Sequence, residues 1–318
     1  MKRFKAAILA VLPSTVQTCW WMVRLTVLVS LAVFLLGHFQ ILPFISGALE
    51  PVFAWVGLPG EASLAYVSGY FVNVYSAIAV AVTLDLDPRA MTILGVMVLC
   101  SHNMFVETAI QRKTGSSWVR LVFVRTLSGI FLAWLLHQVL PMSSDPMTGV
   151  VSPQVVQEQS SFGTALGEWL QSVAYLSIKM SVLIFVLNIL QKLLAEYGVT
   201  RWLSGVFAPL LRIFGLPSSC SFLWIVANTL GLAYGGAAML DEVRQGKLTQ
   251  QEIDLLNMHI GISHSNLEDL ILFVSIGAVG WVLLMVRWGM SIILVWGYRL
   301  ERLIRNKCLS LRVDKLQE

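Results

Sequence analysis

Charged side chains are scarce in this sequence. Asp, Glu, Lys and Arg make up 13% of its 318 residues, while hydrophobic residues make up 57%. This balance lies outside the range of soluble globular domains, so we expect most of the chain to face lipid. The net charge of +4 is carried largely by the two tails. That distribution indicates membrane topology, and no nucleic-acid partner is expected.

Signatures of enzymes and metal clusters are also missing. The four cysteines, Cys19, Cys100, Cys220 and Cys308, show no CxxC spacing, so neither a disulfide framework nor a zinc knuckle is indicated. No P-loop GxxxxGK[ST], HExxH or GxSxG motif occurs. We therefore expect no enzyme activity and no cofactor, and we interpret the cysteines as packing residues.

The residue alternation typical of a membrane β-barrel is absent as well. Apolar residues instead form continuous runs, and a helix needs about 20 of them to cross a bilayer. Four runs are long enough: 21–39, 117–140, 173–190 and 279–298. The basic start of the chain precedes the first run without a clear cleavage site, so we expect this helix to be retained. The sequence predicts an all-α polytopic membrane protein.

The chain contains an internal repeat. At a constant offset, Ser46, Gly47, Pro51 and Gly57-Leu58-Pro59 recur as Ser204, Gly205, Pro209 and Gly215-Leu216-Pro217. Farther along, at an offset four residues longer, Ser101-His102, Glu107, Arg125 and Trp134 recur as Ser263-His264, Asp269, Arg287 and Trp296. Polar, Gly, Pro and Trp matches in the same order predict two tandem copies of one unit.

We expect the first copy at 1–140, a linker at 141–163, the second copy at 164–300 and a basic tail at 301–318. The linker contains no Lys or Arg, while both ends of the chain are basic. By the positive-inside rule, both termini are expected to be cytoplasmic and the linker external. Each copy then crosses the membrane an odd number of times, which predicts inverted topology repeats.

The segment after each GLP motif is too short and too broken for two ordinary spans. The second copy places Gly231, Gly235 and Gly236 in the middle of this segment. We therefore predict a re-entrant helical hairpin in each copy. Such backbone at membrane depth is tolerated where it is buried in protein or lines a wet cavity.

These motifs resemble the Gate, or nucleoside-recognition, domain superfamily. It includes parts of concentrative nucleoside transporters, the membrane region of the ferrous-iron permease FeoB and the spore-maturation membrane proteins. The resemblance covers 41–134 and 199–296 and is carried by three features: the GLP motifs, the Gly69-Tyr70-Phe71-Val72-Asn73-Val74-Tyr75 segment, and a helix with Ser-His in each copy (101–108 and 263–270).

The chain departs from its relatives at informative positions. FeoB-like hairpins resemble Gly-Phe-Gly-Cys-Asn-Val-Pro, whereas Val72 stands here at the cysteine position and Tyr75 at the proline position. With no GTPase domain either, the resemblance gives little support for iron transport. The acidic hairpin motif of a concentrative nucleoside transporter is not recognisable, so the nucleoside label does not transfer to a substrate.

Ionisable groups within membrane segments are costly and are functional candidates by default. The repeat duplicates three of them: Arg24 with Lys179, Glu107 with Asp269, and Arg125 with Arg287. Two inverted copies would bring these groups together near the midplane, where transporter sites built from broken helices lie. The alternative is structural, with Arg125 paired to Glu107 and Arg287 to Asp269 as staples.

Polar residues form a predicted stripe on the helix after each hairpin. Residues four apart share a helix face, and these pairs are Asn103 with Glu107, His264 with Glu268, and Ser265 with Asp269. The two histidines His102 and His264 can relay protons or bind a substrate, or they can be hydrogen-bonded packing residues. A metal site made from them with Glu107 and Asp269 is chemically possible, but without a cysteine cluster or a closely spaced histidine pair we expect none.

Two asparagines lie near the hairpin breaks. Asn73 and Asn228 can hydrogen-bond a ligand or cap the half-helices, and the sequence leaves both interpretations open. His259 and Asn257 precede the second Ser-His pair and are expected to face water.

The leading functional hypothesis is a secondary transporter or permease for a small polar solute, with its site between the inverted copies. Four buried cations against three acids mildly favour an anion. The alternative is a membrane scaffold or accessory protein that retains the Gate architecture without transport. The expected location is the bacterial cytoplasmic (inner) membrane, and the expected partners are the lipid bilayer and the solute. A homo-oligomer is left open.

Overall fold

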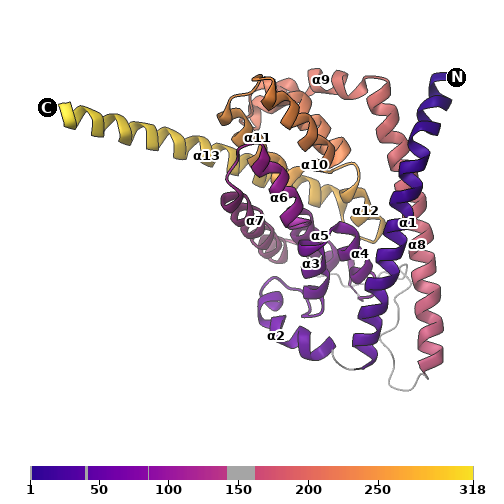
Figure 1. The fold of residues 1–318 in the computed structure, drawn as a ribbon. Helices are drawn as coiled ribbons and strands as arrows, with labels where there is room; N and C mark the ends of the chain where they lie inside the picture. Colours follow the sequence, from indigo (N-terminus) through magenta and orange to yellow (C-terminus); the bar gives the residue numbers. More distant parts are fainter. Residues whose placement is uncertain (1, 40–41, 85, 142–161, 318) are drawn as a thin grey trace.

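The computed structural model describes residues 2–39, 42–84, 86–141 and 162–317 (Figure 1). This described part is helical throughout and contains no strand. Most of the predicted linker, 142–161, lies outside the described residues. The elements of the first copy are α1 (Lys2–His38), α2 (Leu42–Trp55), α3 (Ala62–Phe71), α4 (Val74–Ala81), α5 (Pro88–Ser101), α6 (Met104–Lys113) and α7 (Trp118–Val139). Those of the second are α8 (Phe162–Glu196), α9 (Val199–Ile213), the short η1 (Ser218–Cys220), α10 (Ser221–Arg244), α11 (Gln250–Ser263), α12 (Asp269–Ser275) and α13 (Gly280–Gln317).

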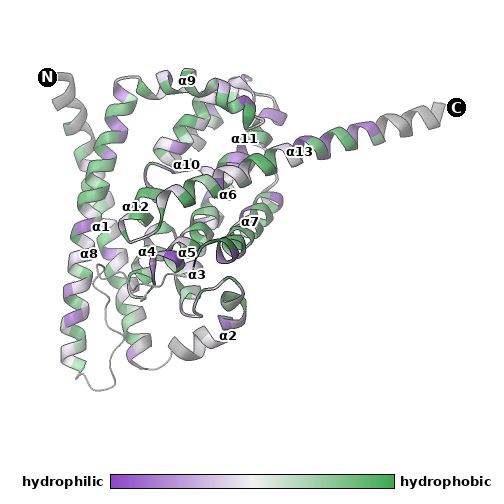
Figure 2. Cartoon of the chain, turned by 180° about the vertical axis from the view of Figure 1, so that it is seen from behind, coloured by the Kyte–Doolittle hydropathy of each residue, from purple (hydrophilic) through white to green (hydrophobic). Residues whose placement is uncertain are grey.

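Five segments of the described chain are long and apolar enough to cross a membrane. Four of them, in α1, α7, α8 and α13, fall on the four runs expected from the sequence. The fifth, Pro88–Lys113, joins α5 and α6. Figure 2 shows hydrophobic residues along the outer helices α7 and α8, as expected for surfaces in contact with lipid. The fold is that of a polytopic α-helical membrane protein.

The first helices of the two copies, α1 and α8, lie side by side and run in opposite directions (Figure 1). Hydrogen bonds along their interface give the register. The indole of Trp169 donates to Ser30 Oγ over 3.0 Å, and at the other end Asn188 Nδ2 donates to Thr15 Oγ1 over 3.3 Å. Polar side chains buried between the helices therefore find partners across the pair.

Each GLP motif ends a helix. Gly57 and Gly215 both adopt left-handed backbone, with φ of 73° and 74°, a conformation that glycine reaches without strain. The following amide donates back to a carbonyl five residues earlier, to Phe53 in the first copy and to Leu211 in the second. This is the hydrogen bond of a Schellman C-cap, and the proline after it prevents the helix from continuing.

The segment after each GLP motif folds back on itself as a helical hairpin. In the first copy the chain breaks at Asn73 between α3 and α4, and Gly69 faces Ala77 so closely that a Cβ on Gly69 would lie 2.9 Å from that of Ala77. In the second copy α10 breaks at Gly231, where φ is 82° and ψ is 171°, and Gly235 packs on Ala227. Of the three glycines named in the middle of this segment, Gly231 is the one at which the helix breaks.

Small side chains allow this close packing in both copies. In a membrane, lipid tails are as apolar as the protein, so helices associate through close van der Waals contact between small residues. The same principle applies where Gly129 of α7 lies against Met97 and Cys100 of α5. Cys100 is fully buried at that contact, which agrees with its predicted role in packing, whereas Cys308 is exposed, so that interpretation is wrong for it.

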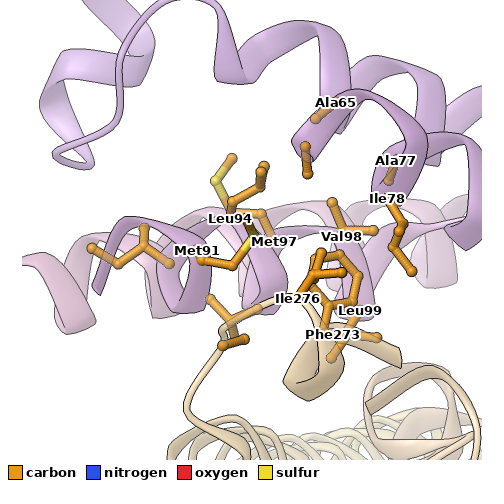
Figure 3. Packing of buried hydrophobic residues seen from close by; sticks show 14 of the residues in the cluster. Ala65, Ala77, Ile78, Met91, Leu94, Met97, Val98, Leu99, Phe273 and Ile276 are labelled. Atoms are coloured by element: carbon orange, nitrogen blue, oxygen red, sulfur yellow. The ribbon is translucent and has the colours of Figure 1, made fainter. Parts of the chain in front are cut away.

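The hydrophobic core joins the two copies through α5. Phe273 of α12 lies near Gly95 of α5, 3.1 Å from the position a Cβ would take there. Figure 3 shows this layer, with α5 lying between the first hairpin and α12. Its labelled members are Ala65, Ala77 and Ile78 of the hairpin, Met91, Leu94, Met97, Val98 and Leu99 of α5, and Phe273 and Ile276 from the second copy.

The prediction that one continuous helix runs through each Ser-His pair is wrong. Instead, α5 ends at Ser101 and α6 begins at Met104, while α11 ends at Ser263 and α12 begins at Asp269. Asn103 and Ser265 lie in these gaps and are the two residues other than glycine with positive φ in the described chain, at 49° and 56°. The predicted stripe is therefore divided: Asn103, His264 and Ser265 lie in the helix interruptions, while Glu107 and Asp269 lie in the first turns of α6 and α12.

Candidate functional site

The interruptions are tied to the hairpins by matching hydrogen bonds. The amide of Asn103 donates to Gly69 O over 2.9 Å, and the amide of Ser265 donates to Ala227 O over 3.0 Å. Four helix breaks therefore meet in one region: one in each hairpin and one after each Ser-His pair. Backbone that leaves a helix at membrane depth needs such internal partners because lipid offers none.

Two fully buried arginines hold the ends of the interrupted helices. Arg125 Nε donates to Cys100 O over 2.9 Å, and one of its terminal nitrogens donates to His102 O over 2.8 Å. Arg287 makes the same pair of bonds, to Ile262 O at 2.7 Å and His264 O at 2.6 Å. Each guanidinium thus binds the carbonyl end of a helix, where the helix dipole favours a positive charge.

The two arginines differ in their third partner. Arg125 forms an ion pair with Glu107 over 2.7 Å, so the pairing considered for the first copy is present. Arg287 instead donates to Asn266 Oδ1 over 3.0 Å, and no described carboxylate lies within salt-bridge distance of it. The predicted pair of Arg287 with Asp269 is wrong because the side chain of Asn266 takes the position that Asp269 was expected to fill.

The centre of the region is a cluster of ionisable groups from both copies. His102 Nε2 lies 3.3 Å from Glu107 Oε1 of its own copy and 3.1 Å from Asp269 Oδ2 of the other. His264 Nε2 lies 3.2 Å from Glu107 Oε2. We call these four residues, His102, Glu107, His264 and Asp269, the central cluster. Their exposed fractions are between 1% and 6%, so this conformation closes the cluster to solvent.

A third acidic residue, Glu268, lies beside the two in the cluster. Glu268 accepts hydrogen bonds from Tyr75 Oη over 2.5 Å and from Gln191 Nε2 over 3.2 Å. Tyr75 and Gln191 come from the first hairpin and from α8, and neither was predicted as a site residue. The sequence holds a signal for each of them: Tyr75 belongs to the hairpin segment 69–75, and Gln191 is an amide side chain within an apolar helix.

The asparagines near the hairpin breaks have different tasks. Asn73 caps α4, because its Oδ1 accepts from the amide of Ser76 over 3.0 Å. Asn228 Oδ1 accepts from Asn266 Nδ2 over 2.6 Å, so it supports the residue that binds Arg287. Capping is the alternative that the structure supports for Asn73, and Asn228 belongs to a network instead.

The remaining predicted cations lie outside the centre. Arg24 is exposed on α1, and Lys179 binds the main-chain oxygen of Ser275 at the carboxyl end of α12. Asn257 and His259 are both fully buried, so the expectation that they face water is wrong. Asn257 Nδ2 donates to Thr114 Oγ1 and Ser116 Oγ over 2.9 Å each, and its position six residues before the Ser-His pair gave no signal of that contact.

Two hollows lie apart from the central cluster. One, of about 460 Å³, is mostly apolar and is lined by residues of α1, α3 and α4. The other, of about 240 Å³, lies near the start of α7 and includes Arg120, Asp254 and Arg302. No residue of the central cluster lines either hollow.

Fold and site together define a polytopic helical membrane protein whose interrupted helices surround a buried ionisable centre. Residues 19–113 match the family model described as Gate, nucleoside recognition. The chain is also 27% identical over 298 residues to the uncharacterized membrane protein YvoD of Bacillus subtilis (strain 168), a match that covers 91% of this chain and 93% of YvoD. No solved structure matches the chain. This match agrees with the resemblance to the Gate family within the first copy.

Proposed function

We propose that the protein is a secondary transporter or permease for a small polar solute. The observation that carries this proposal is the contact between ionisable groups of the two copies, His102 with Asp269 and His264 with Glu107, at the meeting of four helix breaks. Buried ionisable groups are costly in a membrane protein and are usually kept where ions or solutes pass. Discontinuous helices around a central site are typical of secondary transporters.

The arrangement of the copies supports inverted topology. Helices α1 and α8 are equivalent in the repeat and run antiparallel, and their successors α2 and α9 lie at opposite ends of the bundle (Figures 1 and 2). A two-fold relation of this kind lets one set of contacts open toward either side of the membrane in turn. The closed central cluster corresponds to an occluded conformation in that cycle.

The side chains that face one another at the centre indicate which charge of solute the site suits. The four cations that favoured an anion are Arg24, which is exposed, and Lys179, Arg125 and Arg287, which bind main-chain oxygens. The groups that face one another in the centre are two imidazoles and two carboxylates. This set suits a cation or a neutral hydrogen-bonding solute, so we withdraw the preference for an anion.

We propose the bacterial cytoplasmic membrane as the location, with both termini cytoplasmic and the linker external. The basic residues at both ends of the chain support this orientation. Labelling of a single cysteine placed at Ser160 tests it. An impermeant reagent should react in intact cells, and reaction confined to lysed cells would refute the inverted arrangement.

A non-transporting scaffold remains the second candidate because of the arginine contacts. Arg125 and Arg287 bind two helix-end carbonyls each, which are structural contacts that a solute need not share. If the protein is a scaffold, substitutions that remove the cluster charges should lower its stability, and neither the wild type nor the variants should transport a solute.

Uptake into proteoliposomes separates the two candidates. The panel contains nucleosides, because the family model is described as nucleoside recognition, together with amino acids, carboxylates and divalent metal ions. Protein-dependent uptake of one class, reduced by unlabelled solute of that class, supports transport. Equal accumulation in protein-free liposomes and in proteoliposomes across the panel, with folded protein, contradicts it and favours the scaffold.

A further inference from the structure

Both histidines of the central cluster are fixed through the same ring nitrogen. His102 Nδ1 lies 3.1 Å from Val98 O, and His264 Nδ1 lies 2.7 Å from Ile260 O. A carbonyl oxygen can accept a hydrogen bond but cannot donate one, so each Nδ1 carries a proton. In a neutral imidazole the lone pair then resides on Nε2.

Both Nε2 atoms point toward carboxylate oxygens. They lie between 3.1 and 3.3 Å from Glu107 or Asp269, and an ionised carboxylate also offers lone pairs alone. Within the described part, His264 Nε2 is buried and finds no hydrogen-bond donor or acceptor in good geometry. Lone pairs therefore face lone pairs, and a proton or a metal cation between them is needed to make these contacts favourable.

We propose that a divalent transition-metal ion, bound by His102, His264 and Asp269, fills this role. One ligand atom from each of the three lies within 4.8 Å of the other two. Metal bonds of about 2.0–2.2 Å to nitrogen and oxygen place ligand atoms about 3.3 Å apart in tetrahedral geometry, so side-chain movements of roughly 1 Å complete the site. A main-chain carbonyl that binds Nδ1 and leaves Nε2 free is the usual support of a metal-binding histidine.

Ligand chemistry selects the kind of metal. Imidazole nitrogen suits zinc, iron, cobalt and nickel, whereas magnesium and calcium prefer oxygen ligands throughout. Glu107 lies beside both rings but is held by Arg125 at 2.7 Å, so Asp269 is the carboxylate that is free to bind. Three protein ligands leave a position open for water or for an oxygen or nitrogen atom of a solute.

The contacts between the imidazoles and the carboxylates would also be favourable if each ring carried a second proton. The ring centroids of His102 and His264 are 5.1 Å apart, and Arg125 and Arg287 are already buried nearby. Two imidazolium ions would add two mutually repelling N–H groups to this centre, whereas one shared metal ion supplies the same charge and binds both lone pairs. The inference refines the proposed central site, yet metal binding by isolated protein does not depend on transport.

The test uses full-length protein in detergent, stripped with a chelator and reloaded. Zinc content measured by elemental analysis should approach one ion per chain, and cobalt should give the visible absorption of a low-coordinate nitrogen and oxygen site. His102→Gln, His264→Gln and Asp269→Asn should each weaken zinc binding at least tenfold. His38→Gln is the matched control, because it removes another of the five histidines and should leave binding unchanged.

The shift in melting temperature on adding zinc gives a second measure of binding for variants that fold less well. Zinc should raise the melting temperature of the wild type and of His38→Gln and should leave that of Asp269→Asn unchanged. No stoichiometric metal in wild-type protein, or equal binding by all variants, overturns the metal site and leaves protonated histidines as the explanation. Stoichiometric binding without uptake of any solute would keep the metal site and reject the transporter.

Discussion

The imidazole of His102 lies 3.1 Å from the carboxylate of Asp269, measured between Nε2 and Oδ2, and thereby joins the two copies of the repeat at their centre. Asp269 begins α12, and His102 follows the last residue of α5. The contact therefore forms between two helix ends and depends on the packing of α12 against α5. Any relative movement of the copies at this point must break or replace it.

The two equivalent acids should differ in their effect on stability. Glu107→Gln leaves the buried Arg125 without its counter-ion, which should cost on the order of 3–5 kcal/mol. Asp269→Asn should cost about 1–2 kcal/mol, because His102 keeps Glu107 and Arg287 never paired with Asp269. Unfolding followed by circular dichroism in detergent measures both values.

A double variant tests whether the stability loss of Glu107→Gln comes from leaving Arg125 without its counter-ion. In Glu107→Gln with Arg125→Gln, neither charge remains, so the combined loss should be smaller than the sum of the two single losses. Carbonyl oxygens of Cys100 and His102 still lose a donor, so full recovery is not expected. Strictly additive losses would show that the ion pair does not stabilise the fold.

Arg287→Gln should destabilise the second copy although no salt bridge is lost. Its guanidinium donates to Ile262 O, His264 O and Asn266 Oδ1, and a glutamine cannot reach all three acceptors. A loss of about 2–4 kcal/mol is expected, since hydrogen bonds from charged groups contribute about 1.5–3 kcal/mol each. Arg24→Gln, on the exposed face of α1, is the control and should change the unfolding free energy little.

Gly231→Ala should weaken the second hairpin. The backbone there has φ of 82° and ψ of 171°, a region that is almost closed to residues with a side chain, so a loss of about 1–3 kcal/mol is expected. Gly205→Ala within α9 is the control, because nothing lies within 4 Å of its added methyl group and alanine favours helix. Equal effects of the two substitutions would refute the strained break.

The start of α11 gives a pH-dependent prediction. Thr249 and Glu252 form a capping box, and hydrogen bonds from Ser219 and Thr249 lower the pKa of Glu252 below its ordinary value of 4.5. A lowered pKa means that the stabilisation is complete above that ordinary value and disappears as the pH falls through the folded-state pKa. The stability difference between wild type and Glu252→Gln should therefore narrow in acid.

Thr249→Ala removes the cap itself and should cost about 1 kcal/mol near neutral pH. Chemical unfolding at several pH values checks both variants. A stability difference for Glu252→Gln that stays constant from neutral to acid pH would contradict the role of the ionised carboxylate.

Features with a local cause were predictable from the sequence. The GLP motifs recur as helix ends because glycine and proline act within a few residues of their position, and the break at Gly231 has the same origin. The ion pair of Arg125 with Glu107 was also predicted, because an unpaired charge within a membrane segment is costly.

Contacts that depend on the folded arrangement were not predictable in detail. The repeat suggested that Arg287 would pair with a carboxylate as Arg125 does. Arg287 binds Asn266 instead, and the residue equivalent to Asn266 in the first copy is the apolar Met104, so the two copies differ at this position. The Ser-His pairs were assigned to helices because their neighbours favour helix. Their interruption depends on arginines far along the chain that bind the freed carbonyls, a cause that periodicity does not reveal.

The most direct measurement is uptake by proteoliposomes that contain Asp269→Asn, compared with wild type and with His38→Gln for the solute identified by the panel. The substitution keeps the shape of the side chain and costs little stability, so folded protein should insert normally. We predict at least a tenfold lower initial rate for Asp269→Asn and an unchanged rate for His38→Gln. Wild-type rates from well-folded Asp269→Asn protein would contradict the claim that the central cluster handles the solute.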